Sequence, residues 1–163
     1  MAELKDTGER KVFESGAMRD ISEGKGRCDL LPLDVVSYIL DPIDKSGILK
    51  SINGFLKTGE VERLKDAIFL FSADTKSDLI TMLLELSIHY EDGARKYEDN
   101  NWKKGIPVHS FIDSGVRHYL KWLRGDQDEP HDRAFLWNMF GAIWTMKNKP
   151  EFNDIQGYEG DAD

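Results

Sequence analysis

The chain has 163 residues, a length typical of one domain with its own hydrophobic core. Hydrophobic residues make up 40% and aromatic residues 10%, which excludes a chain that stays disordered for lack of apolar side chains. The formal net charge of −8 disfavours binding to a nucleic acid polymer or to an anionic membrane. A small phosphate ester is not excluded, because it needs only a few local cations and often a divalent metal.

The single cysteine, Cys28, cannot form an internal disulfide, so the chain does not resemble a disulfide-stapled secreted domain. No apolar run approaches the ~20 residues that span a bilayer. Residues 1–16 are polar and mixed in charge, without the apolar segment of a signal peptide. We therefore expect a cytoplasmic protein.

Residues 1–28 are predicted to form an irregular arm, because glycines lie among charged residues and no apolar periodicity is present. From residue 29 on, apolar side chains recur at helical spacing. They predict a short helix that ends before Pro42, a second helix over 43–57 and a third from Glu60 to Phe71.

Three longer helices, over 77–97, 108–124 and 130–148, are expected to build the core of the bundle. Ser77 and Asp78 offer N-cap chemistry, Gly125 offers a C-cap, and Pro130 suits a first helical position. The sequence thus predicts an all-α fold: a compact helical bundle over 29–149 and a frayed, flexible tail over 150–163.

Three polar clusters are candidates for chemistry. The first is Gly24-Lys25-Gly26-Arg27, where glycine backbone amides and two cations suit a phosphate, although a solvated basic turn explains it equally well. The second runs from Glu85 through His89, Glu91, Asp92 and Lys96 to Asn101 and Trp102. Helical spacing would place several of its carboxylates and cations on one face, either as a Mg²⁺ site or as a solvent face of ion pairs.

The third cluster contains Asp113, Arg117, His118, Asp128, Glu129, His131 and Asn138. Asp113 and Arg117 are four residues apart and can pair on one helix face. His131 and Asn138 lie in a helix that is otherwise almost entirely apolar, so each needs a hydrogen-bond partner or a ligand. A lone histidine there is most often structural, whereas two histidines joined by an acidic loop favour a site.

Several dispersed motifs then follow one another in order. They are Gly16-Ala17-Met18-Arg19-Asp20 with Gly24 to Pro32; His89-Tyr90-Glu91, Gly93-Ala94, Lys96-Tyr97, Asn101-Trp102 and Gly105-Ile106-Pro107; and Asp113-Ser114-Gly115, Arg117-His118, Gly125, Asp128-Glu129, His131 and Trp137-Asn138. Together they resemble the dATP/dGTP diphosphohydrolase N-terminal family, common in bacteriophages. The resemblance covers residues 16–32 and 89–138, and we interpret residues 42–76 as an insertion.

The resemblance implies hydrolysis of dATP or dGTP to the monophosphate and pyrophosphate, in the host cytoplasm if the chain is phage-encoded. The family is similar to the MazG-like all-helical pyrophosphohydrolases, in which helix carboxylates hold a divalent metal, here Mg²⁺ or Mn²⁺. Their paired Glu-x-x-Glu and Glu-x-x-Asp signature is not evident in this sequence. We therefore choose metal ligands by residue type: Glu91, Asp113, His118, Glu129 and His131.

Further roles follow from the same resemblance. The catalytic candidates are Glu91, Asp113, His118 and His131. The phosphate-binding candidates are Lys25, Arg27, Lys96 and Arg117. Trp102 is expected to stack on the base, and Asn101 or Asn138 to read its edge.

Two rival functions remain open. An HD-type phosphohydrolase is suggested by His118 and by His131-Asp132, and requires a distant aspartate, for which Asp154 is available. A non-catalytic nucleotide-binding or phage interaction protein is the rival from another class. Four Trp and eight Phe also predict a homo-oligomer, because an excess of apolar surface tends to form interfaces.

Overall fold

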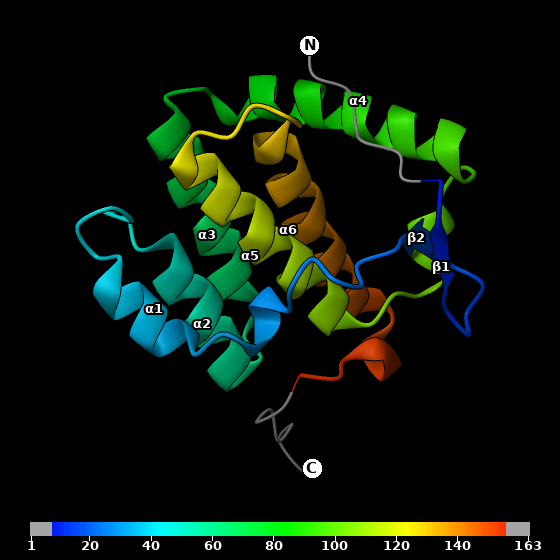
Figure 1. Ribbon diagram of the computed structural model, residues 1–163, viewed down its shortest axis with the longest axis horizontal. Coiled ribbons are helices and arrows are strands. Elements are labelled where there is room, and N and C mark those ends of the chain that lie inside the picture. The colour runs from blue at the N-terminus through cyan, green and yellow to red at the C-terminus, as the bar shows by residue number, and fades with distance from the viewer. Residues whose placement is uncertain (1–7, 156–163) are drawn as a thin grey trace.

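A computed structural model describes residues 8–155 of the chain (Figure 1). Six α-helices dominate this part, joined by short 3-10 turns and preceded by one two-stranded hairpin. The predicted all-α fold class is therefore confirmed. Within the described part, no helix is long and apolar enough to cross a membrane.

The centre of the fold is an antiparallel pair of helices, α5 (Val108–Arg124) and α6 (His131–Asn148), seen in Figure 1 as the yellow-green and orange helices. Gly125 ends α5 in the left-handed conformation, at φ 85°, which glycine adopts without steric cost. Gly141 lets the two helices approach closely. A Cβ at this position would lie 2.3 Å from the ring of the fully buried Phe111.

Three further helices complete the core: α1 (Leu33–Ile39), α2 (Ile48–Thr58) and α3 (Val61–Thr75). Leu49, Phe55 and Phe71 from these helices are fully buried in the same cluster as residues of α5 and α6. The buried Asp44 accepts hydrogen bonds from two amides at the start of α2 and from the Tyr119 hydroxyl of α5. Residues 42–76 thus contribute to the core. The prediction that only the three long helices build the core is therefore too narrow.

The helix α4 (Leu79–Lys96) crosses the bundle at one end, packing on α6 and α3 (Figure 1). As predicted from the sequence, the Asp78 side chain caps it by accepting a hydrogen bond from the Thr81 amide. Only Met82, Leu86 and His89 are buried on this helix. The exposed Ile80 and Leu84 leave an apolar strip in solvent.

The N-terminal segment, expected to be irregular, carries a short antiparallel hairpin of β1 (Arg10–Val12) and β2 (Met18–Asp20). A tertiary contact holds this hairpin in place. The Asn101 side chain accepts a hydrogen bond from the Met18 amide and donates one to the Met18 carbonyl, both at 2.7 Å. Such a contact over 83 residues leaves no local signal in the sequence. Of the predicted C-terminal tail, residues 150–155 are described and include the turn η3 (Pro150–Phe152), while residues 156–163 lie outside the described part.

Candidate active site

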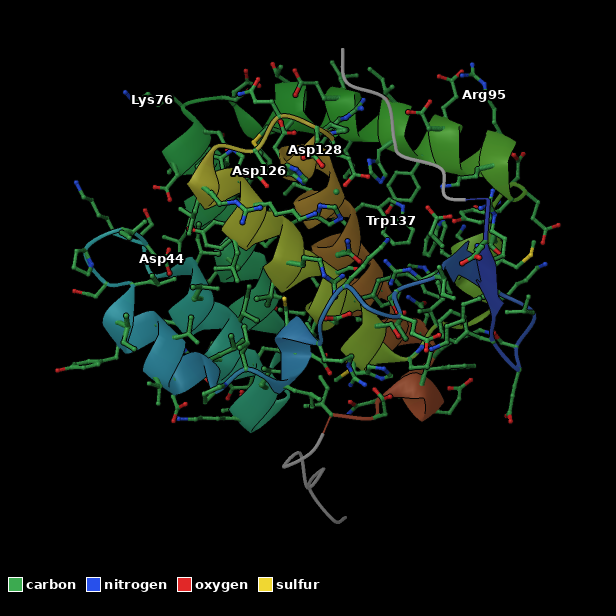
Figure 2. All side chains as sticks on the ribbon, viewed as in Figure 1. Asp44, Lys76, Arg95, Asp126, Asp128 and Trp137 are labelled. Atoms are coloured by element: carbon green, nitrogen blue, oxygen red, sulfur yellow. The ribbon has the colours of Figure 1, made fainter. Side chains whose placement is uncertain are left out.

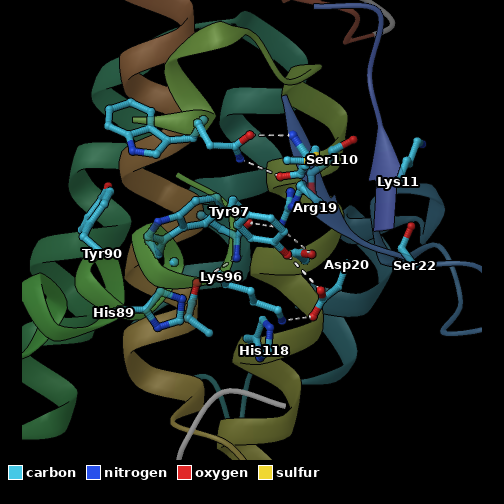
Figure 3. A pocket seen from close by; sticks show the side chains of 18 of the residues that line it. Lys11, Arg19, Asp20, Ser22, His89, Tyr90, Lys96, Tyr97, Ser110 and His118 are labelled. Atoms are coloured by element: carbon cyan, nitrogen blue, oxygen red, sulfur yellow. Dashed lines mark hydrogen bonds and ion pairs between the residues drawn. The ribbon is translucent and has the colours of Figure 1, made fainter. Parts of the chain in front are cut away.

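A cavity of about 660 Å³ opens between the hairpin, α4, the turn η2 (Asn101–Lys104), α5 and α6. Figure 3 shows part of its lining, whose side chains come from segments far apart in the sequence. This volume lies within the range of about 300–1,000 Å³ that is typical of small-molecule sites. The cavity is therefore large enough for a nucleotide.

The lining of the cavity is more basic than the chain as a whole. Seven cationic side chains face six carboxylates, in a protein whose net charge is −8. The cationic residues are Lys11, Arg19, Lys25, Arg27, Lys96, Arg117 and Lys121. Such a local excess of positive charge on an acidic protein favours an anionic ligand at this place.

Arg19 on β2 is, with Lys11 and Lys121, one of three lining cations that were not predicted from the sequence. Its guanidinium donates to the Ser110 carbonyl at 3.2 Å, the Ser114 hydroxyl at 3.2 Å and the Asn138 amide oxygen at 3.1 Å. Within residues 8–155 no carboxylate forms an ion pair with it, and burial lowers its pKa to about 10. A cation held by neutral acceptors at the wall of a cavity suits an anionic ligand.

The aromatic rings of Phe111 and Trp137 flank this guanidinium. Their centroids lie 5.5 and 5.2 Å from its central carbon, so cation–π attraction adds to the hydrogen bonds that position it. No local pattern in the sequence marked Arg19, although it stands in the first motif of the family resemblance.

Asp20 follows Arg19 and is held by three donors. Arg10 lies at 3.1 Å. Lys96 lies at 2.5 Å and the Tyr97 hydroxyl at 2.9 Å (Figure 3). These contacts tie the hairpin to the end of α4. Lys96, predicted to bind phosphate, lines the cavity and also forms this ion pair.

The predicted pairing of Asp113 with Arg117 on α5 is present. One guanidinium nitrogen lies 2.6 and 2.7 Å from the two carboxylate oxygens and also donates to the Gly26 carbonyl. The Cys28 amide donates to Asp113 at 2.6 Å. Asp113 therefore anchors the segment before α1, and its charge is already balanced by a cation.

His118 and His131 lie in contact although thirteen residues separate them. Their Nδ1 atoms are 2.9 Å apart, and His131 Nε2 is 2.8 Å from the Asp128 carboxylate. Figure 2 shows Asp126 and Asp128 on the loop that joins α5 and α6. Burial and the neighbouring His131 hold the pKa of His118 well below its usual value, so His118 is neutral at pH 7.

A group of three possible metal ligands results. His118, Glu129 and His131 offer donor atoms that all lie within 4.8 Å of one another. The other two predicted ligands do not join them: Asp113 is paired with Arg117, and Glu91 on α4 pairs with the exposed Arg95 at 3.0 Å.

Aromatic side chains line another part of the cavity. Tyr90 contacts Trp102 edge-to-face, with ring centroids 5.7 Å apart, and also lies near Trp137. His89 lies beside Trp137, and burial lowers its pKa to about 4, so it is neutral at physiological pH. This region offers flat apolar surface to a heterocyclic base.

The remaining residues that were predicted to bind the ligand also line the cavity, but they differ in exposure and in hydrogen-bond partners. Lys25 and Arg27 are exposed, and Arg27 forms a two-bond contact with Asp29. The amides of Asn101 and Asn138, expected to read the base, are engaged within the protein: Asn101 holds Met18, and Asn138 bonds to Arg19 and to the Ala134 carbonyl.

Of the residues required by the HD-type rival, His118 and His131 meet, but Asp132 and Asp154 do not join them. Asp154 bonds to the amide and ring of His109, and Asp132 is in neither of the metal-ligand groups found within residues 8–155. The geometry therefore gives no support to that alternative.

Comparison with known proteins identifies the family of the chain. No curated protein and no solved structure shows a significant match to the chain. The family described as "dATP/dGTP diphosphohydrolase, N-terminal" matches residues 72–155, which is more than half of the chain. The matched segment includes α4, α5 and α6 and with them most of the cavity lining. The chain belongs to the dATP/dGTP diphosphohydrolase N-terminal family.

Proposed function

We propose that the cavity binds a purine deoxynucleoside triphosphate, dATP or dGTP, and hydrolyses it to the monophosphate and pyrophosphate. The observation that carries this proposal is the basic, nucleotide-sized cavity in an acidic protein of a diphosphohydrolase family. In the reaction, a water oxygen forms a bond to the α-phosphorus. The bond from the α-phosphorus to the bridging oxygen then breaks, and pyrophosphate leaves.

The lining offers a distinct surface to each part of this substrate. The base fits against Trp102 and its aromatic neighbours, where stacking needs no hydrogen bond to a particular edge. The triphosphate fits the seven cations of the lining, among them Lys25, Arg27 and Lys121. Arg19, whose hydrogen-bond partners within residues 8–155 are all neutral, is the cation that gains most from a phosphate oxygen.

The proposed reaction uses a divalent metal, Mg²⁺ or Mn²⁺. Among the five ligands predicted from the sequence, His118, Glu129 and His131 fit it best, because their donor atoms are grouped at the cavity. When bound, such an ion neutralises charge on the phosphates and lowers the pKa of a bound water.

Glu91 is the side chain that we assign to aligning the attacking water. Asp20 and Asp113 are each held by a cation that also lines the cavity. Glu91 lines the cavity too, but its ion-pair partner, Arg95, is an exposed residue outside the lining. A carboxylate whose partner is exposed is freer to turn toward a water in the cavity than one held by a cation of the cavity wall.

Product analysis over a panel of nucleoside triphosphates tests this function. With Mg²⁺ or Mn²⁺ present, we expect dATP or dGTP to give the monophosphate and pyrophosphate in equal amounts. Release of tripolyphosphate would instead indicate an HD-type reaction. Binding of these nucleotides without turnover would favour the non-catalytic alternative.

A further inference from the structure

Two imidazoles and a carboxylate meet where the start of α6 faces α5. The Nδ1 atoms of His118 and His131 are 2.9 Å apart, and a Glu129 oxygen lies within 4.8 Å of a nitrogen of each ring. His131 is only 2% exposed, whereas His118 and Glu129 line the cavity. The His118–Glu129–His131 group is therefore backed by protein and open toward the cavity.

Asp128 determines which nitrogen of His131 carries a lone pair. Its carboxylate lies 2.8 Å from Nε2, and a carboxylate accepts hydrogen bonds, so Nε2 carries the hydrogen. In the neutral ring Nδ1 then has the lone pair, and this atom is the one that faces His118. At a metal-bound histidine, one ring nitrogen usually donates a hydrogen bond to a carboxylate, and the other nitrogen binds the metal.

The spacing of the two Nδ1 atoms suits two neighbouring ligands of one ion. When two nitrogens bind one ion at about 2.0–2.1 Å, with a nitrogen–metal–nitrogen angle between a right angle and the tetrahedral angle, they lie about 2.8–3.4 Å apart. The separation of 2.9 Å falls within this span. The two rings therefore need little movement to bind a common ion.

The donor set also selects among metals. Mg²⁺ prefers an octahedron of oxygen ligands and keeps several waters, whereas imidazole suits first-row transition ions. Neither of the two groups of possible metal ligands found within residues 8–155 consists of carboxylates alone, and Asp20 and Asp113 of the cavity lining are each paired with a cation. Two nitrogens and one carboxylate oxygen favour a transition ion.

We propose that His118, Glu129 and His131 form a binding centre for a single first-row transition-metal dication in preference to Mg²⁺, with Asp128 holding the orientation of His131. This inference deepens the proposed function and rests on it for the role of the metal in hydrolysis. Metal binding itself is independent of turnover and can be measured without any nucleotide.

The test is a titration of the full chain with Co²⁺, followed by visible absorption and by calorimetry. We expect one equivalent to bind, with d–d bands typical of nitrogen and oxygen ligation, and a large excess of Mg²⁺ not to displace it. His118→Ala should abolish this binding. Asp128→Asn should weaken it by about 10- to 100-fold, as the loss of a supporting hydrogen bond does at other metal sites.

Two matched controls separate this centre from its neighbours. His109→Ala removes another histidine of the cavity lining, one bonded to Asp154, and should leave Co²⁺ binding unchanged. Asp126, Asp128 and His131 form a second group of possible ligands, so Asp126→Asn is compared with Glu129→Gln. We expect Glu129→Gln to weaken binding at least about 10-fold and Asp126→Asn to have little effect.

Far-UV circular dichroism confirms that each variant is folded before its affinity is compared. Co²⁺ binding by folded Glu129→Gln with the affinity of the wild type, or equal competition by Mg²⁺, would overturn the inference. Turnover with Mg²⁺ in a protein that binds no Co²⁺ would overturn it too, while leaving the pyrophosphohydrolase proposal intact. Co²⁺ binding without turnover of any nucleotide would support the centre and count against that function.

Discussion

Replacing Arg19 with methionine removes a positive charge from the cavity while keeping a side chain of similar length. A hydrogen bond to a charged group contributes about 1.5–3 kcal/mol, and 1.4 kcal/mol corresponds to a tenfold change in affinity. If Arg19 binds one phosphate oxygen, Arg19→Met should raise the Kd for a non-hydrolysable dGTP analogue by about 10- to 140-fold.

The nucleotide-free protein should remain folded after this substitution. Arg19→Met loses three hydrogen bonds from a charged donor, each contributing about 1.5–3 kcal/mol. Removal of a partly buried cation that has no carboxylate ion-pair partner within residues 8–155 relieves a desolvation cost of several kcal/mol and offsets most of this loss. We therefore expect the free energy of unfolding to fall by no more than about 3 kcal/mol.

Calorimetric titration of wild-type protein and two variants provides the assay. Arg95→Met is the matched control, because it makes the same change in net charge at an exposed residue outside the cavity lining. We expect the control to bind the analogue like the wild type. An Arg19→Met protein that is folded and binds as tightly as Arg95→Met would refute the anchoring role of Arg19.

Three other predictions concern stability and assembly. Burial lowers the pKa of His89 to about 4, against an ordinary value of 6.5, so the unfolded chain binds a proton at a higher pH than the folded protein does. About 3 kcal/mol of stability is therefore present above pH 6.5 and is lost as the pH falls toward 4. The free energy of unfolding of His89→Phe, measured in urea, should depend correspondingly less on pH. Gly141→Ala should cost about 1–3 kcal/mol in thermal unfolding, because its Cβ would overlap the Phe111 ring, whereas Gly93→Ala meets nothing within 4 Å and should not destabilise. We also propose a homodimer through the exposed apolar strip of α4, so light scattering should give a dimer for the wild type and a monomer for Leu84→Asp.

The helices were predictable from the sequence because their signals are local. Apolar spacing located α4, α5 and α6, and the Asp78 cap and the left-handed Gly125 appear where the sequence placed them. The ion pair of Asp113 with Arg117 followed from a four-residue spacing on one helix. Such features depend on residues within one or two turns of each other.

The features that escaped prediction depend on contacts between distant segments. Arg19 meets Ser110 and Asn138 only after the hairpin has docked on α5 and α6. The sequence did predict His118 and His131 in one site, but His118 lies nearly two turns before its loop, so the distance between the two rings depends on how the helices cross rather than on sequence spacing. The hairpin itself depends on Asn101, and neither of its three-residue strands is long enough to show a strand pattern.

Hydrolysis of dGTP and dATP in ¹⁸O-labelled water, with the products analysed by mass spectrometry, tests the central claim most directly. Attack on the α-phosphorus places the label in the monophosphate and leaves pyrophosphate unlabelled, and this is the result that we predict. Label in pyrophosphate, release of tripolyphosphate, or the absence of any turnover with either Mg²⁺ or Mn²⁺ would contradict it.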